Sequence, residues 1–107
     1  MAANREDSAL VLEALSDPTQ RKVLELLRGG AKPVCEIARR LPVSRPAVSQ
    51  HLRVLLDADL VRSRREGVRR LYSVGPKGLA PLRAYLESFW DQALAAFKST
   101  AEKQGGR

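Results

Sequence analysis

The chain lacks the features that mark several large classes of protein. Cys35 is the single cysteine among 107 residues, so no disulfide can form within the chain and a disulfide-stapled secreted scaffold is excluded. No stretch approaches the roughly 18 consecutive apolar residues of a membrane helix. The first eight residues do not pair a basic stretch with an apolar run, as a signal peptide would. We therefore expect a cytoplasmic protein with no membrane partner.

Catalytic signals are equally scarce. The chain holds one histidine, His51, and no glycine-rich loop of the kind that cradles phosphates. Ser49 and His51 are two positions apart, so they do not face each other on a helix. We expect no catalytic residues, no cofactor and no enzyme activity.

The net charge points to a polyanionic partner. Lysine and arginine number 19 against 12 acidic residues, which gives a formal charge of +7. An excess of cations attracts nucleic acid or an acidic membrane surface. Fourteen of the cations are arginine, whose guanidinium group binds phosphate and guanine through two parallel hydrogen bonds. The codon usage of a GC-rich genome is an alternative source of the arginine excess.

Apolar spacing and turn residues predict a mainly α-helical domain with one small β-hairpin. Asp17 and Ser44 precede prolines in the pattern of helix N-caps, and Gly29 and Gly30 end the second helix. The predicted helices span residues 9–15, 18–28, 34–41, 45–58 and 79–102, and the predicted strands span 60–65 and 69–74. We expect Pro76, Lys77 and Gly78 to form the loop after the hairpin. A single domain would cover residues 9–103, with dimerising terminal helices and flexible ends at 1–8 and 104–107.

Two short helices, a tight turn and a basic hairpin predict a winged helix-turn-helix. The helix that begins after Ser44 buries Val48, Leu52, Leu55 and Leu56 on one side, so its polar side is held outward. A DNA major groove is about 12 Å wide and admits one such helix. The hairpin adds Arg62, Arg64, Arg65, Arg69 and Arg70 against one acid, Glu66. These arginines suit a DNA backbone or minor groove, although charges also keep a hairpin edge from pairing with another chain.

Three segments in this order resemble the ArsR family of bacterial repressors: Leu15–Arg21 (LSDPTQR), Ser44–Leu52 (SRPAVSQHL) and Arg64–Tyr72 (RREGVRRLY). The resemblance implies a homodimer that represses transcription from a palindromic operator in double-stranded DNA until an inducer, here unknown, releases it. It also implies which residues meet DNA. The recognition helix would present Ser44, Arg45, Pro46, Ser49, Gln50 and Arg53, and the wing would present Arg64, Arg65, Arg69 and Arg70.

The chain departs from the family pattern before the wing and at the metal sites. Asp59 stands where the family usually has glycine, and we expect a positive φ there because aspartate tolerates that region better than most residues. Some family members bind metal through two cysteines in the third helix or through Asp and His on the last helix. Here only Cys35 matches the first pattern and the last helix lacks histidine. We predict no metal site.

Two single residues have competing interpretations. His51 lies at the edge of the buried stripe, where we expect packing together with a role on the phosphate side of the DNA site. Cys35, near the start of a helix, is either a small buried apolar residue or a thiol sensor activated by the helix dipole.

The last helix carries a large apolar load that predicts a homodimer. Two recognition helices would then reach half-sites about one DNA turn apart, and a two-fold partner would bury the aromatic residues. The first helix would join the contact. The predicted interface consists of Leu10, Val11, Leu82, Leu86, Phe89, Trp90 and Phe97.

The leading prediction is a sequence-specific dimeric repressor of transcription. The alternatives are a winged-helix module that binds protein or RNA, and a repressor that responds to thiol oxidation at Cys35. A steep salt dependence and a preference for one duplex over random DNA would separate the leading prediction from the first alternative.

Overall fold

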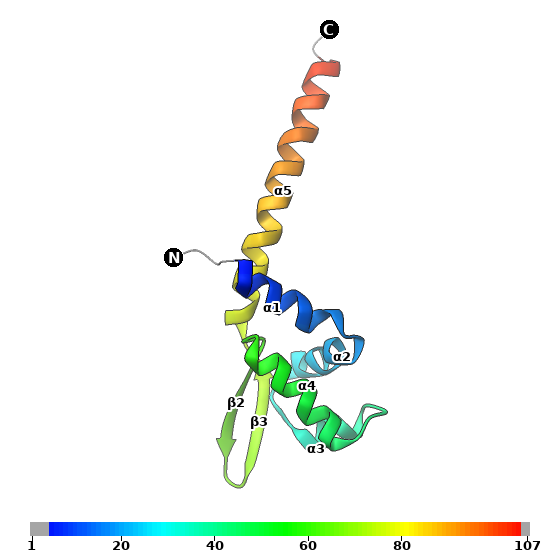
Figure 1. The fold of residues 1–107 in the computed structure, drawn as a ribbon, viewed down its shortest axis with the longest axis vertical. Helices are drawn as coiled ribbons and strands as arrows, with labels where there is room; N and C mark the ends of the chain where they lie inside the picture. The colour runs from blue at the N-terminus through cyan, green and yellow to red at the C-terminus, as the bar shows by residue number, and fades with distance from the viewer. Residues whose placement is uncertain (1–4, 106–107) are drawn as a thin grey trace.

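Helices dominate the computed structural model, which describes residues 5–105 (Figure 1). A short three-stranded sheet extends from one side of the helical body. The helices are α1 (Arg5–Ser16), α2 (Pro18–Leu26), α3 (Val34–Arg39), α4 (Arg45–Asp57) and α5 (Pro76–Gly105), with a 3₁₀ turn η1 (Leu27–Gly29); the strands are β1 (Lys32–Pro33), β2 (Val61–Glu66) and β3 (Arg69–Val74). This arrangement confirms the predicted mainly helical winged fold.

Side-chain caps begin two of the helices where the sequence predicts them. The backbone N–H groups of Thr19 and Gln20 donate to Oδ1 of Asp17 at 2.7 and 3.1 Å. The Oγ atom of Ser44 accepts from the backbone N–H of Ala47 at 3.3 Å. Each cap satisfies N–H groups that have no partner within the helix, which fixes where α2 and α4 start.

The sheet has one more strand than the sequence predicts. β3 lies in the centre, paired antiparallel with β2 on one side and with β1 on the other. Gly67, with φ of 65°, and Val68 form the two-residue turn between β2 and β3, where glycine in the first central position suits a hairpin. β1 is only two residues long, too short for an alternating apolar pattern, so pairing with β3 alone reveals it.

One hydrophobic core joins the helices to the base of the sheet. Ile37, Leu52, Leu55, Leu60 and Val23 are among its fully buried side chains. Residues from α1, α2, α3, α4 and β2 all contribute to this cluster. The core therefore holds α4 firmly from behind.

The turn after α4 is a Schellman motif built around Asp59. The N–H of Leu60 donates to the carbonyl of Leu55 at 2.9 Å, and the N–H of Asp59 donates to Leu56 at 3.0 Å. These two bonds close the helix end and require a left-handed residue between them. Asp59 has φ of 59°, which confirms the predicted positive φ.

The start of α5 corrects the predicted loop at Pro76, Lys77 and Gly78. These residues form the first turn of α5, since proline suits the first helical position and Gly78 packs against the preceding turn. The N–H of Gly78 donates to the carbonyl of Asp59 at 2.9 Å. A Cβ atom at Gly78 would lie 2.3 Å from the carbonyl oxygen of Ala58, so only glycine fits this approach.

Other helix boundaries also shift. α1 begins at Arg5 rather than residue 9, and α5 continues to Gly105; the remaining residues of the predicted flexible ends, 1–4 and 106–107, lie outside the described residues. α2 gives way to a 3₁₀ turn at Leu27, and α3 ends at Arg39, two residues early. Helix ends differ by such amounts because fraying and tightening cost little.

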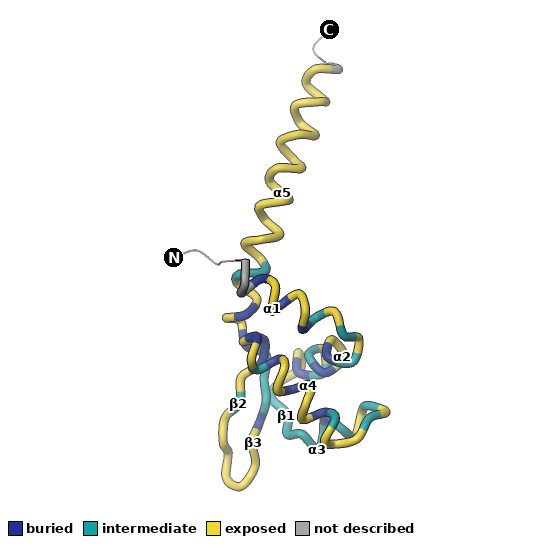
Figure 2. Tube along the Cα trace, in the orientation of Figure 1, coloured by how far each residue is buried: buried dark blue, intermediate teal, exposed yellow. Residues whose placement is uncertain are grey.

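α5 is a long arm that leaves the body. It has 30 residues, about 45 Å at the usual rise, and gives the molecule extents of 69 × 32 × 21 Å. Near its start it crosses α1, where Ser8 Oγ donates to the carbonyl of Pro81 at 3.3 Å. Beyond Leu82 its described side chains are exposed (Figure 2). No helix in the described range is long and apolar enough to span a membrane.

Candidate nucleic-acid interface

α4 presents a polar side to solvent while its other side is anchored. Val48, Leu52 and Leu55 are at most 1% exposed. Because these three residues recur at helical spacing, the opposite side of α4 cannot rotate inward. Six of the predicted recognition residues are exposed on or just before α4: Ser44, Arg45, Pro46, Ser49, Gln50 and Arg53. Their side chains are therefore available to a partner that lies along the helix.

His51 is half-buried and contacts a buried amide. Its Nδ1 atom lies 3.2 Å from Oε1 of Gln20, and Nε2 of Gln20 donates to the carbonyl of Ala14. Since that donation directs the amide oxygen toward His51, Nδ1 of the imidazole carries the proton and donates. Gln20 is only 7% exposed. It thereby links α1, α2 and α4, a role that the sequence analysis missed because a lone glutamine carries no pattern.

Asp17 lies at the N-terminus of α2, near the same network. Hydrogen bonding from the N–H of Gln20 is the largest effect and lowers the pKa of the Asp17 carboxyl below its usual 3.8. The N–H of Thr19 and the charges of His51 and Arg21 act in the same direction, against partial desolvation. The cap is therefore a carboxylate at neutral pH, which also suits the positive end of the helix dipole.

The hairpin of β2 and β3 forms a basic wing beside the helical body. All four predicted wing residues, Arg64, Arg65, Arg69 and Arg70, are exposed. Arg64 pairs with Glu66 at 3.5 Å, and Nη1 of Arg70 donates to Oγ of Ser63 at 3.1 Å. Both contacts lie on the solvent-exposed surface of the wing.

Two further arginines, which the sequence analysis did not single out, lie close to α4. Arg39 ends α3 and Arg40 caps it, and both are exposed at the turn that leads to Ser44. In a helix-turn-helix the first helix crosses the DNA backbone. The signal that could have found them is their place in the sequence, as adjacent cations directly before the break at Leu41 and Pro42.

Comparison with known proteins decides the family. The sequence pattern described as "Bacterial regulatory protein, arsR family" matches residues 17–63. The chain is 50% identical over 93 residues to the HTH-type transcriptional regulator Rv2034 of Mycobacterium tuberculosis, and the match covers 87% of each protein. The chain belongs to the ArsR family. It is a winged helix-turn-helix transcriptional regulator, as predicted from the three matching segments.

Another relative and a solved structure show a similar likeness. The chain is 41% identical over 64 residues to the transcriptional repressor SdpR of Bacillus subtilis, covering 60% of this chain and 71% of that one. It also resembles a solved homodimeric winged helix-turn-helix DNA-binding domain from Mycobacterium bovis, with a TM-score of 0.66 and 30% identity. That likeness covers 83% of this chain and 82% of the other.

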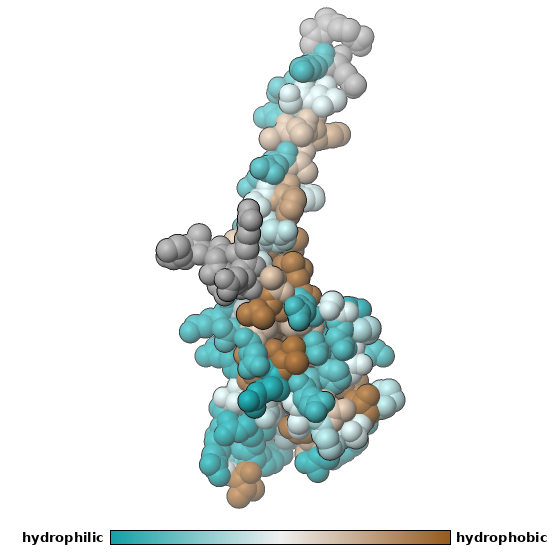
Figure 3. Space-filling view, in the orientation of Figure 1, coloured by the Kyte–Doolittle hydropathy of each residue, from teal (hydrophilic) through white to brown (hydrophobic). Residues whose placement is uncertain are grey.

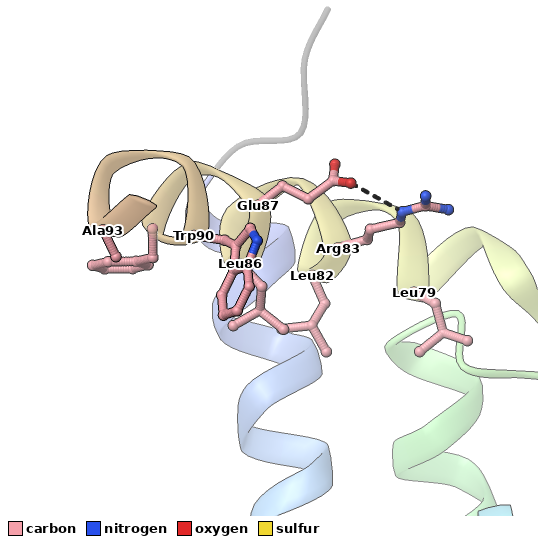
Figure 4. A pocket seen from close by; sticks show the side chains of 8 residues that line it. Leu79, Leu82, Arg83, Leu86, Glu87, Trp90 and Ala93 are labelled. Carbon is pink, nitrogen blue, oxygen red and sulfur yellow. Dashed lines mark hydrogen bonds and ion pairs between the residues drawn. The ribbon is translucent and has the colours of Figure 1, made fainter. Parts of the chain in front are cut away.

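The ArsR-family chain exposes an apolar surface where a dimer contact was predicted. Leu10, Leu86 and Phe89 are half-exposed, Trp90 is 65% exposed and Phe97 is 72% exposed. Figure 3 shows hydrophobic surface where α5 leaves the body and in places along the helix, whereas the wing is mostly hydrophilic. In Figure 4, Leu82, Leu86 and Trp90 project from one side of α5, and the ion pair of Arg83 with Glu87, 3.4 Å long, lies on another side. An open hollow of about 720 Å³ beside α5 is lined by residues of this helix, with Arg83 and Glu87 at its edge.

Two of the predicted interface residues belong wholly or partly to the core of the same chain. Val11 is 1% exposed and lies in the central hydrophobic cluster. Leu82 is partly buried against that cluster. The prediction for Val11 is therefore wrong, because α1 turns this residue into the central cluster while Leu10, its neighbour, is 51% exposed.

Cys35 lies half-buried near the start of α3 in this ArsR-family protein. Within the described part of the chain, no three His, Cys, Asp or Glu side chains gather closely enough to hold a metal ion. Thiol sensing at Cys35 stays a prediction.

Proposed function

We propose that the protein is a homodimeric repressor that binds a palindromic site in double-stranded DNA. The observation that carries this proposal is the exposed polar side of α4, anchored by Val48, Leu52 and Leu55, beside a wing of arginines. An α-helix held in this way fits the major groove. We expect the protein to act in the cytoplasm, where bacterial DNA lies. Repression by DNA binding requires no catalytic step.

Each element has a distinct role in the proposed complex. Arg45, Gln50 and Ser49 lie in the first two turns of α4, from which side chains reach base edges. Arg39, Arg40 and the wing arginines contact backbone phosphates, which hold the protein in register without reading sequence. Ser44, Pro46, His51 and Arg53 complete the DNA-facing part of α4.

The dimer is proposed to form through α5 and the outer side of α1. Trp90, Phe89 and Phe97 together expose more apolar surface than a lone helix arm keeps in water. A symmetric partner buries the same residues from both chains. The homodimeric domain from Mycobacterium bovis supports this assembly, and the name of the Bacillus relative supports repression.

Footprinting on DNA upstream of the chain's own gene tests the proposal, followed by gel shifts on the protected duplex and on random DNA. Arg45→Ala should lower the preference for the protected duplex by about 1–3 kcal/mol if Arg45 contacts a base. Lys98→Ala removes the same charge from the far part of α5 and should leave the preference unchanged. Equal losses on both duplexes for Arg45→Ala would contradict its base-reading role. Absence of any shift at low salt, or a stronger affinity for single-stranded RNA, would contradict the function itself.

A further inference from the structure

The two faces of the wing carry different side chains because residues alternate along a strand. Arg65 of β2 stands directly opposite Arg70 of β3, on the face that also carries the opposed pair Ser63 and Tyr72. On the other face Glu66 stands opposite Arg69. The full sets are Val61, Ser63, Arg65, Arg70, Tyr72 and Val74 on the first face, and Arg62, Arg64, Glu66, Arg69, Leu71 and Ser73 on the second.

Only one of these faces carries an acid. Glu66 pairs with Arg64 at 3.5 Å and stands across the strand pair from Arg69, so one acid lies among the three arginines of the second face. On the first face, Arg65 and Arg70 face each other without an acid, and neither makes an ion pair within the described residues. Directly opposed side chains lie about 4.5–5.5 Å apart at Cβ, and like charges at that distance destabilise a hairpin. An anion between them would remove this repulsion.

Ser63 holds one of the two arginines in place. The Nη1 atom of Arg70 donates to its Oγ atom at 3.1 Å, within the same face. This bond uses one of the five guanidinium donors and restricts the side chain, so the remaining donors are positioned before a partner arrives. Ser63 is half-buried and faces Tyr72.

The face with Arg65 and Arg70 is also the face that turns toward the helices. Val61 belongs to the core cluster, and Tyr72 and Val74 pack against it. Leu52 and Leu55 of α4 are members of the same cluster. Along this face, the wing therefore runs outward from the core that anchors α4 to Arg65 and Arg70 near the tip of the hairpin.

We propose that Arg65 and Arg70 form a clamp for a backbone phosphate of the DNA, with Ser63 as the residue that positions Arg70. Arg64 and Arg69 contribute less, because Glu66 competes with phosphate for their charge. The clamp rests on the proposed function. It divides the four predicted wing arginines into a pair that binds phosphate with no acid on its face and a pair that shares its face with Glu66.

Matched double variants test the clamp on a random duplex of about 30 base pairs, three helical turns. Arg65→Gln with Arg70→Gln, and Arg64→Gln with Arg69→Gln, remove the same net charge from the same hairpin. The first variant should lose about 10- to 100-fold in affinity, and its slope of log affinity against log salt should fall by about one. The second should lose only a few-fold. Without DNA, the first variant should keep or raise the midpoint of thermal unfolding, because a repulsive pair is gone.

Variants at Ser63 test the positioning role. Ser63→Ala should reduce affinity a few-fold without changing the salt slope by a full unit, because Arg70 keeps its charge but loses its fixed orientation. Ser63→Thr keeps the hydroxyl and should restore binding. Equal losses of affinity in the two double variants, or a larger loss in the Arg64 and Arg69 variant, would overturn the clamp. If the wild-type protein still binds DNA in that case, the proposed function stands. Failure of the wild-type protein to bind any duplex would overturn the function.

Discussion

The body of the molecule and its last helix solve the problem of apolar surface in opposite ways. From α1 to β3, apolar side chains converge on one cluster, and Val23, Ile37 and Leu55 are completely buried. In α5, every described side chain from Arg83 onward is exposed, Trp90 and Phe97 among them. The body buries most of its apolar side chains within one chain, whereas those of the far part of α5 remain uncovered by the same chain.

The body and α5 also have different tasks. The body holds α4 and the wing rigidly, which DNA recognition requires, since side chains must meet base edges in a fixed geometry. α5 sets where a second body would stand.

The largest expected effect comes from removing an exposed aromatic side chain of α5. Trp90→Ala should convert the dimer to monomers, because each aromatic residue of this size buries about 150–250 Å² when covered. Light scattering measures the mass in solution. Val68→Ala, at the wing tip where Val68 is 99% exposed, is the matched control and should leave the mass unchanged. A Trp90→Ala dimer of unchanged stability would place the interface elsewhere.

The start of α5, where Gly78 packs against the turn after α4, should tolerate substitution poorly. At Gly78→Ala the new methyl group would lie 2.3 Å from the carbonyl oxygen of Ala58 and 2.7 Å from that of Asp59, both backbone atoms. We expect a loss of about 2–3 kcal/mol in unfolding free energy, measured by urea denaturation. Gly75→Ala is the control: its closest neighbour is the flexible stem of Arg62, so the loss should be smaller. Equal losses would contradict a special role for the start of α5.

Within the body, removing a cap should weaken α4 without disturbing α5. Ser44→Ala leaves the N–H of Ala47 without its side-chain acceptor and should cost about 1 kcal/mol of stability. Ser44→Asp keeps an acceptor and should retain stability. Urea denaturation and light scattering together check the prediction, because the oligomeric state should remain that of the wild type in both variants.

The smallest effect is a dependence on pH at the cap of α2. The pKa of Asp17 is lowered in the folded protein, chiefly by the N–H of Gln20. The carboxylate therefore stabilises the fold above its ordinary pKa of 3.8, and this contribution disappears as the pH falls through the lowered value. Asp17→Asn keeps a capping oxygen but does not titrate, so its thermal midpoint should fall less on acidification toward about pH 3. Parallel acid curves for the two proteins would refute this assignment.

The sequence predicted best where a signal is local. Asp17 and Ser44 predict the starts of α2 and α4, because a capping oxygen must precede the N–H groups from which it accepts. The positive φ of Asp59 was predicted because the resembling family usually has glycine at this position and aspartate tolerates that region better than most residues. The exposed side of α4 follows from the spacing of Val48, Leu52 and Leu55. In each case the cause and the effect lie within a few residues of each other.

Prediction was weaker where a contact joins distant segments. β1 exists because Pro33 pairs with Leu71, and Gln20 matters because it reaches both Ala14 and His51. Val11 and Leu10 are neighbours of similar apolar character, yet only the packing of α1 decides that Val11 enters the core. None of these outcomes is written in a local pattern.

The sequence by itself determined the order of helices and hairpin, the basic charge of the wing, and the likeness to the ArsR family, since periodicity, capping and motif spacing are properties of the chain alone. The tertiary structure decided which arginines of the wing face the same side, which apolar residues remain uncovered, and which carbonyl oxygens leave room only for Gly78. These depend on strand register and helix packing, which bring together atoms that are far apart in the chain, and no single segment contains that information.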